Sequence, residues 1–170
     1  LAMLTPVTNK AAAVLVSAEN AVCAASSSGS GIAARVVPVN TPYGHGFGLA
    51  AANISGENGG WAAATCTPKT SFDRGNNEAF GMWVKGDGKG ERLAVELVEA
   101  PWSASVHVFD IDFTGWRYLN FHFYERDPDL FSEDVWPYGD CSTLYTRGLY
   151  LNPVSGRNFG RVVFALARLP

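Results

Sequence analysis

Rings with polar tips alternate with apolar residues in the stretch WRYLNFHFYER at 116–126. Because successive side chains of a strand point to opposite sides, this stretch predicts a strand with two unlike faces. The apolar face holds Leu119, Phe121 and Phe123. The other face holds Tyr118, Asn120, His122, Tyr124 and Arg126. Such a face can stack on and hydrogen-bond a polar, ring-shaped ligand, so it predicts a sugar-binding surface.

Neighbouring segments of strand length are predicted to extend this surface. With the apolar residues of 80–85 turned inward, Trp83 and Lys85 point outward. The same alternation turns Glu96 and Tyr150 outward from their own strands. The predicted ligand-binding residues are Tyr118, Asn120, His122, Tyr124, Arg126, Tyr150, Trp83, Lys85 and Glu96. The alternative is that the rings only cover an edge of the fold or pack beneath the long loop that follows them.

Catalysis is an alternative to binding on the same face. His122 with Tyr118 and Tyr124 has the side-chain types of an acid and base pair, since histidine titrates near neutral pH. The sequence lacks the Arg-rich and Gln-x-His strand patterns of β-sandwich polysaccharide lyases. Asp110 and Asp112 share a strand face, as paired glycosidase carboxylates can, but they adjoin a Thr-Gly turn and are predicted to hold it. We therefore predict no catalytic residue, with a lyase as the less favoured alternative.

Metal-binding patterns are weak. Acidic residues gather between 125 and 140, and oxygen-rich loops can hold calcium, but a solvated loop is the favoured interpretation. His45 and His107 have no companion ligands at a metal-binding spacing. The sequence thus predicts no cofactor with certainty and leaves a structural calcium ion open.

The run GDGKG at 86–90 has the composition of a phosphate-binding loop but not its context. No Ser or Thr follows Lys89, and the next segment alternates as a strand does. Asp-Gly suits the centre of a tight hairpin, where positive φ is required. We therefore predict a hairpin turn that joins the strands on either side.

Turn signals rich in Gly, Pro, Asn and Ser divide the chain at short intervals, which favours a sandwich or a barrel. Segment 10–25 is left between helix and strand, because its alanines favour helix and its valines favour strand. The strands expected are 32–39, 47–54, 61–67, 80–85, 92–98, 105–109, 117–124, 148–152 and 161–167. We expect an all-β protein, a jelly-roll β-sandwich of two antiparallel sheets, as a single domain over 1–170 with residues 1–30 unassigned.

Length and composition indicate the size of the domain, the kinds of molecule it can bind and its location. The 170 residues suit one domain with a substantial core. A net charge of −3 without a Lys/Arg run lacks the electrostatic footprint of a protein that binds nucleic acid or an anionic membrane. Charged residues make up 17% and aromatic residues 12%, which favours a secreted or extracellular protein. Because position 1 is Leu, we expect a module cut from a longer chain or a processed product.

The three cysteines, Cys23, Cys66 and Cys141, leave their pairing open. An odd number cannot pair completely within one chain, and the wide spacing lacks the close pairs of a zinc site. One disulfide with one free thiol, or three buried thiols, are both compatible with the sequence.

Two motifs resemble those of the galactose-binding-domain-like β-sandwiches. One is WVKGDGKG at 83–90, and the other is DIDFTGW at 110–116. The segments GFGLAAAN, GWAAAT, GLYLN and GRVVFAL look like further strands of that family, so the resemblance covers roughly 44–169. Nearest in pattern are carbohydrate-binding modules of polysaccharide-degrading enzymes, including those that bind β-glucan.

The resemblance implies a non-catalytic module that tethers a secreted polysaccharide-degrading enzyme to its glycan. Its partners would be a polysaccharide or oligosaccharide and a catalytic domain in the parent chain. Such modules often hold calcium through an acidic residue of the last strand, but GRVVFALARLP at 160–170 has none. Complex I intermediate-associated proteins share the pattern, so a protein-interaction or assembly domain is the alternative.

Overall fold

The computed structural model describes residues 2–4, 17–28, 31–41, 44–52, 54, 60–70, 72–73, 79–100, 103–122 and 158–168. Within these ranges all regular structure is antiparallel β-strand and no helix is present, which confirms the all-β prediction. The strands are β1 (Ala2–Leu4), β2 (Ala21–Ser27), β3 (Ala33–Thr41), β4 (Gly44–Ala52), β5 (Trp61–Pro68), β6 (Phe72–Asp73), β7 (Ala79–Asp87), β8 (Glu91–Ala100), β9 (Ser103–Ile111), β10 (Thr114–His122), β11 (Asn158–Phe159) and β12 (Arg161–Arg168).

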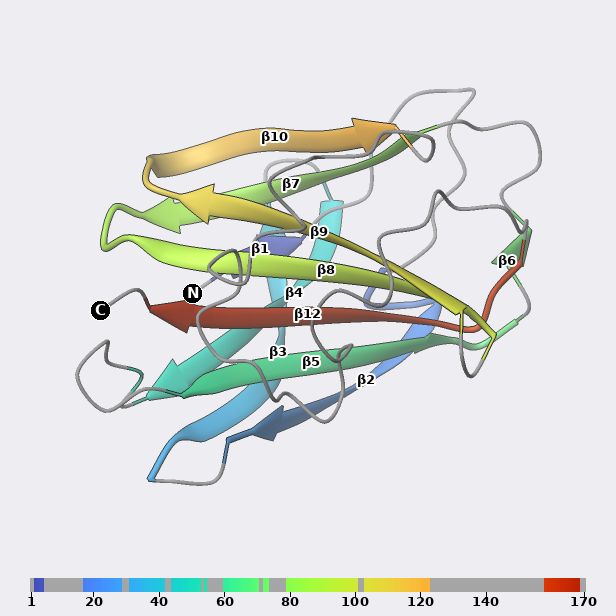
Figure 1. The fold of residues 1–170 in the computed structure, drawn as a ribbon, viewed down its shortest axis with the longest axis horizontal. Coiled ribbons are helices and arrows are strands. Elements are labelled where there is room, and N and C mark those ends of the chain that lie inside the picture. The colour runs from blue at the N-terminus through green and yellow to red at the C-terminus, as the bar shows by residue number, and fades with distance from the viewer. Residues whose placement is uncertain are drawn as a thin grey trace.

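The largest sheet has five strands in the order β2-β5-β12-β8-β9. A second sheet has the order β1-β4-β3, and two further pairs are β10-β7 and β11-β6. In Figure 1 the five-stranded sheet crosses the view, with β9 above and β2 below, while β1, β3 and β4 are drawn behind it. The β7–β10 pair lies at the upper side of the molecule (Figure 1). The predicted strand at 148–152 lies outside the described residues.

One hydrophobic core receives side chains from the five-stranded sheet, from β3 and β4, and from β7 and β10. Phe47 of β4 and Phe164 of β12 meet in it with their ring centroids 5.7 Å apart. Leu93, Val95 and Leu97, which the sequence places inward, are fully buried there. Burying one such side chain is worth about 1.5–3 kcal/mol. The arrangement is therefore sandwich-like, with layers of strands facing a common core.

The five-stranded sheet is also buried on the face that points away from this core. The side chains that cluster there are Trp61, Ala63, Ala94, Val163, Ala165 and Ala167. The cause is visible in the sequence, since WAAA in β5 and VVFALA in β12 are unbroken apolar runs, typical of strands buried on both faces. A polar side chain on this face of β8 is consequently buried as well.

The GDGKG segment does not form the predicted hairpin. β7 pairs with β10, whereas β8 pairs with β12 and β9, so the chain crosses between sheets here. Gly88 and Gly90 make the crossing with positive φ of 75° and 82°. β9 and β10 are joined by a second crossing, and the Gly88 amide donates a hydrogen bond to the Phe113 carbonyl at 3.0 Å. Glycine is compatible with a hairpin and with a crossing between sheets. The chain crosses here because β7 and β8 bury their apolar faces in one core from different sheets.

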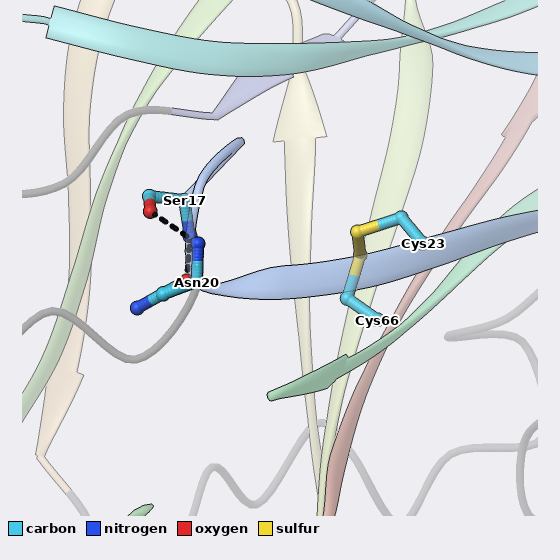
Figure 2. Close-up of a disulfide and its surroundings, with 4 residues drawn as sticks. All are labelled: Ser17, Asn20, Cys23 and Cys66. Atoms are coloured by element: carbon cyan, nitrogen blue, oxygen red, sulfur yellow. Dashed lines mark hydrogen bonds between the residues drawn. A yellow bond between two sulfur atoms is a disulfide. The ribbon is translucent and has the colours of Figure 1, made fainter. Parts of the chain in front are cut away.

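Residues 21–25, the end of the segment that the sequence left between helix and strand, form β2 together with Ser26 and Ser27 at the edge of the five-stranded sheet. A turn precedes the strand, and in it the backbone N–H of Asn20 donates a hydrogen bond to Ser17 Oγ at 3.2 Å (Figure 2). Small polar side chains that bond the nearby backbone favour turns over helix. Residue propensities alone did not distinguish helix from strand here. The turn and the pairing with β5 make the segment a strand.

A disulfide joins β2 to β5. The strand register sets Cys23 directly opposite Cys66, with the Cα atoms 4.1 Å apart. Figure 2 shows the bond between their sulfur atoms, beside the turn that holds Ser17 and Asn20. Of the two alternatives left open by the sequence, the structure contains the disulfide. Cys141 lies outside the described residues.

Candidate functional site

The outer face of β7 and β10 carries most of the predicted ligand-binding side chains that the structure describes. Met82 and Val84 of β7 are buried in the core, as predicted, so the odd-numbered residues of β7 point away from it. In the antiparallel register Tyr118 of β10 lies opposite Trp83, and Asn120 lies opposite Gly81. Directly opposed residues share a face, so even-numbered residues of β10 join odd-numbered residues of β7.

Trp83 and Tyr118 form a ring pair at the centre of this face. Their centroids are 5.3 Å apart and their planes are inclined by 54°. This tilted geometry is one that aromatic pairs prefer, and it contributes about 0.5–1.5 kcal/mol beyond the area buried. Tyr118 remains 36% exposed, and Trp83 is partly buried. The pair therefore combines a rigid position with ring surface open to solvent.

The Tyr118 phenol lies over the neighbouring strand. Its hydroxyl group occupies the space that a Cβ atom on Gly81 would need. Partial burial raises the pKa of Tyr118 above its usual value, so the phenol stays protonated at neutral pH. It can then both donate and accept a hydrogen bond at the edge of the ring surface.

Polar side chains flank the ring pair. Lys85 and Asn120 are exposed on the same face, and Asp87 continues the row of β7. Burial raises the pKa of Asp87, but hydrogen bonds outweigh it, from the Lys89 amide at 3.0 Å and from the Glu91 side chain. The net pKa of Asp87 is below its usual range, and the carboxylate is charged at neutral pH.

Trp116 is a member of this face that the sequence analysis missed. It lies opposite Lys85 in the register and is half-buried. The signal was present, because the two-residue period of Tyr118 and Asn120 extends back by one step to Trp116. Asp87 was missed for the same reason, since it continues the period of Trp83 and Lys85 beyond the predicted end of the strand.

Other predicted residues are placed only in part. His122 lies opposite Ala79 at the end of β10, and its backbone alone is described. Tyr124, Arg126 and Tyr150 lie outside the described residues. Their part in the surface stays a prediction.

Glu96 does not belong to the surface that holds Trp83. It lies on the face of β8 opposite the core residue Val95, as the alternation predicts, but it is only 4% exposed. Because Val84 and Val95 face one core from different sheets, Trp83 and Glu96 point away from that core in opposite directions. Glu96 therefore points outward from its own strand as predicted, but it is buried and lies on another sheet than Trp83. Alternation within a strand does not say which sheet the strand joins or what covers its outer face.

The two carboxylates considered for hydrolysis, Asp110 and Asp112, have different surroundings. Asp110 Oδ1 accepts a hydrogen bond from Arg92 Nε at 2.9 Å across the β8–β9 ladder. Asp112 is exposed beyond the end of β9. Over the described ranges, no group of three or more His, Cys, Asp or Glu side chains is placed to hold a metal ion. The same ranges contain no helix long and apolar enough to cross a membrane.

No protein-family model, no curated protein and no solved structure matches this chain. The chemistry of the outer face of β7 and β10 is therefore the basis for a functional proposal. We call this face the ring surface, and its described members are Trp83, Lys85, Asp87, Trp116, Tyr118 and Asn120.

Proposed function

We propose that the chain is a non-catalytic carbohydrate-binding module whose ligand lies on the ring surface. The observation that carries the proposal is the Trp83–Tyr118 pair, partly exposed on an outward sheet face with Lys85 and Asn120 beside it. The apolar faces of sugar rings stack on aromatic rings, while their hydroxyl groups need donors and acceptors close by. A solvated outer face that binds no ligand would more often carry Lys, Glu, Thr and Ser than two large rings in contact.

The proposed fold is a jelly-roll sandwich of two antiparallel sheets, related to the galactose-binding-domain-like modules. β1 contacts β7 as well as β4, so the second layer would run β3-β4-β1-β7-β10 against the five-stranded sheet. The crossings on either side of the β8–β9 hairpin support this topology, because they fold that hairpin and the β7–β10 pair over one core.

Binding would be weak to moderate. The ring surface is open and polar at its margins, and such surfaces offer few fully desolvated anchors. We expect dissociation constants between about 1 μM and 1 mM, equivalent to roughly 4–8 kcal/mol. This range suits a module that keeps a tethered catalytic domain near a polymer, where many equivalent sites raise the apparent affinity.

The setting we propose is a secreted polysaccharide-degrading enzyme. The Cys23–Cys66 disulfide supports an oxidising compartment, because disulfides persist mainly in secreted proteins. The module would hold the parent enzyme on its glycan and make no bond-breaking step itself.

The test is affinity electrophoresis against a panel of neutral and acidic polysaccharides. We expect retardation by at least one neutral glycan, lost in Trp83→Ala and in Tyr118→Ala. Val22→Ala is the matched control, because Val22 is an exposed apolar residue (62%) on β2 in another sheet. Both ring variants should stay folded but lose the stability of the ring contact, about 0.5–1.5 kcal/mol, which thermal unfolding measures.

The alternatives predict different outcomes in the same assay. Unsaturated oligosaccharide products that disappear in His122→Ala would indicate a lyase. Absence of any glycan binding, together with capture of a protein partner that Trp83→Ala abolishes, would indicate an interaction or assembly domain of the same fold.

A further inference from the structure

Tyr118 is held down on the sheet by the absence of a side chain at Gly81. The two residues are on adjacent strands, with Asn120 directly opposite Gly81 and Tyr118 one step along the same face. The hydroxyl and the ring carbon that bears it lie well inside the 3.0 Å limit for a Cβ built on Gly81. Any larger residue at position 81 would therefore push the ring away from β7.

Gly81 is not required by the backbone. Its φ is not among the positive values found at Gly88 and Gly90, so alanine can adopt the same conformation. All three of the nearest atoms belong to the free end of the Tyr118 side chain. A glycine in a strand interior also weakens the strand slightly compared with alanine. Its use at this point is therefore explained by the space that it leaves for the ring.

The position of Tyr118 sets the shape of the ring surface. Trp83 stands beside it at 5.3 Å, and the two planes meet at 54°. A crystalline polysaccharide surface presents its sugar rings in parallel planes, so only one of two rings tilted in this way can stack on it. A single solvated chain can rotate successive sugars about their linkages and meet both rings.

We propose that Gly81 is a positioning residue that seats Tyr118 against Trp83, and that the tilted pair selects single, solvated glycan chains over crystalline polysaccharide. The proposal rests on the proposed carbohydrate-binding function for its ligand. The seat itself is a property of the fold that can be tested without a glycan.

The first experiment is a double-mutant cycle read by near-ultraviolet circular dichroism, which reports the packing of the ring pair. The variants are Gly81→Ala, Tyr118→Ala and the two together. Gly81→Ala should change the aromatic signal of the wild-type protein, but it should change nothing further in the Tyr118→Ala background. Gly160→Ala is the control, because a Cβ there meets only the Val98 carbonyl oxygen, at 3.9 Å. An equal effect of Gly81→Ala in both backgrounds would show that Gly81 does not act through Tyr118, and it would overturn the proposal.

The same variants also test the proposal if Gly81→Ala prevents folding. If Gly81→Ala alone failed to fold while the double variant folded, the clash with Tyr118 would be demonstrated and the seat supported. If both failed, Gly81 would serve the backbone, and the proposal would be overturned.

The second experiment measures binding to soluble oligosaccharides and to crystalline particles of the same polysaccharide. We expect binding to the soluble chain, weakened roughly three- to tenfold by Gly81→Ala, as for loss of one ring contact. Gly160→Ala, which lies outside the ring surface, should bind as the wild type does. Wild-type binding that is stronger on the crystal, or unchanged in Gly81→Ala, would overturn the proposed selectivity.

Failure of the proposed function has its own signature. Wild-type protein that binds no glycan in either form would refute carbohydrate binding and the selectivity with it. The circular dichroism cycle would then still decide whether Gly81 seats Tyr118.

Discussion

Glu96 lies directly opposite Val163 of β12, buried on the outer face of the five-stranded sheet. Its Oε2 atom has no hydrogen-bond partner among the described residues. Burial raises the pKa of Glu96 to about 7, although the positive charge of Arg161 on β12 lowers it in part. A carboxyl group in this position favours its neutral form, because removing a charge from water costs more than burying a protonated acid.

Stability is therefore expected to depend on pH through Glu96. The folded-state pKa of about 7 is above the ordinary value of 4.5, so folding takes up a proton between these two values. The contribution is fully present below pH 4.5 and is lost as the pH rises through 7. The free energy of unfolding should fall by up to about 3 kcal/mol over this range. Urea titrations at a series of pH values measure it.

Glu96→Gln is the matched variant, since the amide has nearly the same shape and no charge. It should remove the Glu96 part of the pH dependence and leave the protein more stable than wild type above pH 7. An unchanged slope between pH 4.5 and 7 would show that Glu96 does not titrate in this range.

Truncation of a core residue on β8 should be costly. Leu93 is fully buried between the five-stranded sheet and the layer that faces it. Leu93→Ala is expected to lower the free energy of unfolding by about 2–5 kcal/mol through lost burial and the cavity left behind. Val22→Ala, on the exposed side of β2, should stay within about 0.5 kcal/mol of wild type. Equal effects in chemical denaturation would contradict the assigned faces of these strands.

The disulfide should stabilise the fold by limiting the unfolded chain. Cys23 and Cys66 are separated by 43 residues, and closing a loop of this size is worth about 3–4 kcal/mol. The double variant Cys23→Ala/Cys66→Ala should unfold at correspondingly lower urea than oxidised wild type. Peptide mapping without reductant should recover the two cysteines in one linked fragment. Recovery of both as free thiols from unreduced protein would be incompatible with the bond.

Gly86 marks a close approach at the sheet crossing. A Cβ there would meet the Phe113 carbonyl oxygen and the Phe113 ring, both closer than 3.0 Å. Backbone cannot move aside as the end of a side chain can, so Gly86→Ala should cost about 1–3 kcal/mol. Gly160→Ala, where the new Cβ makes only an ordinary contact with the Val98 carbonyl oxygen at 3.9 Å, serves as the control in thermal unfolding. A neutral Gly86→Ala would mean that the β9–β10 corner sits further from β7.

Local periodicity identified the longer strands β3, β4, β5, β7, β8, β9, β10 and β12, but not β1, β2, β6 or β11. Alternation in the described parts of 80–85, 92–98 and 117–124 placed Val84 and Val95 inward, because the period of two is a property of the extended backbone alone. It also predicted that Trp83 and Tyr118 point outward, and the structure brings them together as a pair. The same period carried one step further would have added Trp116 and Asp87.

Sheet membership was decided only by the tertiary structure. Nothing local to GDGKG distinguishes a hairpin from a crossing between sheets, and this choice separates Glu96 from Trp83. The Cys23–Cys66 bond likewise depends on β2 lying beside β5, strands that are far apart along the chain. Gly81 looks like a weak point in a strand until Tyr118 is seen to fill its space. Periodicity says which way a side chain points from its own strand, but its neighbours across and above the sheet are set by packing between distant segments.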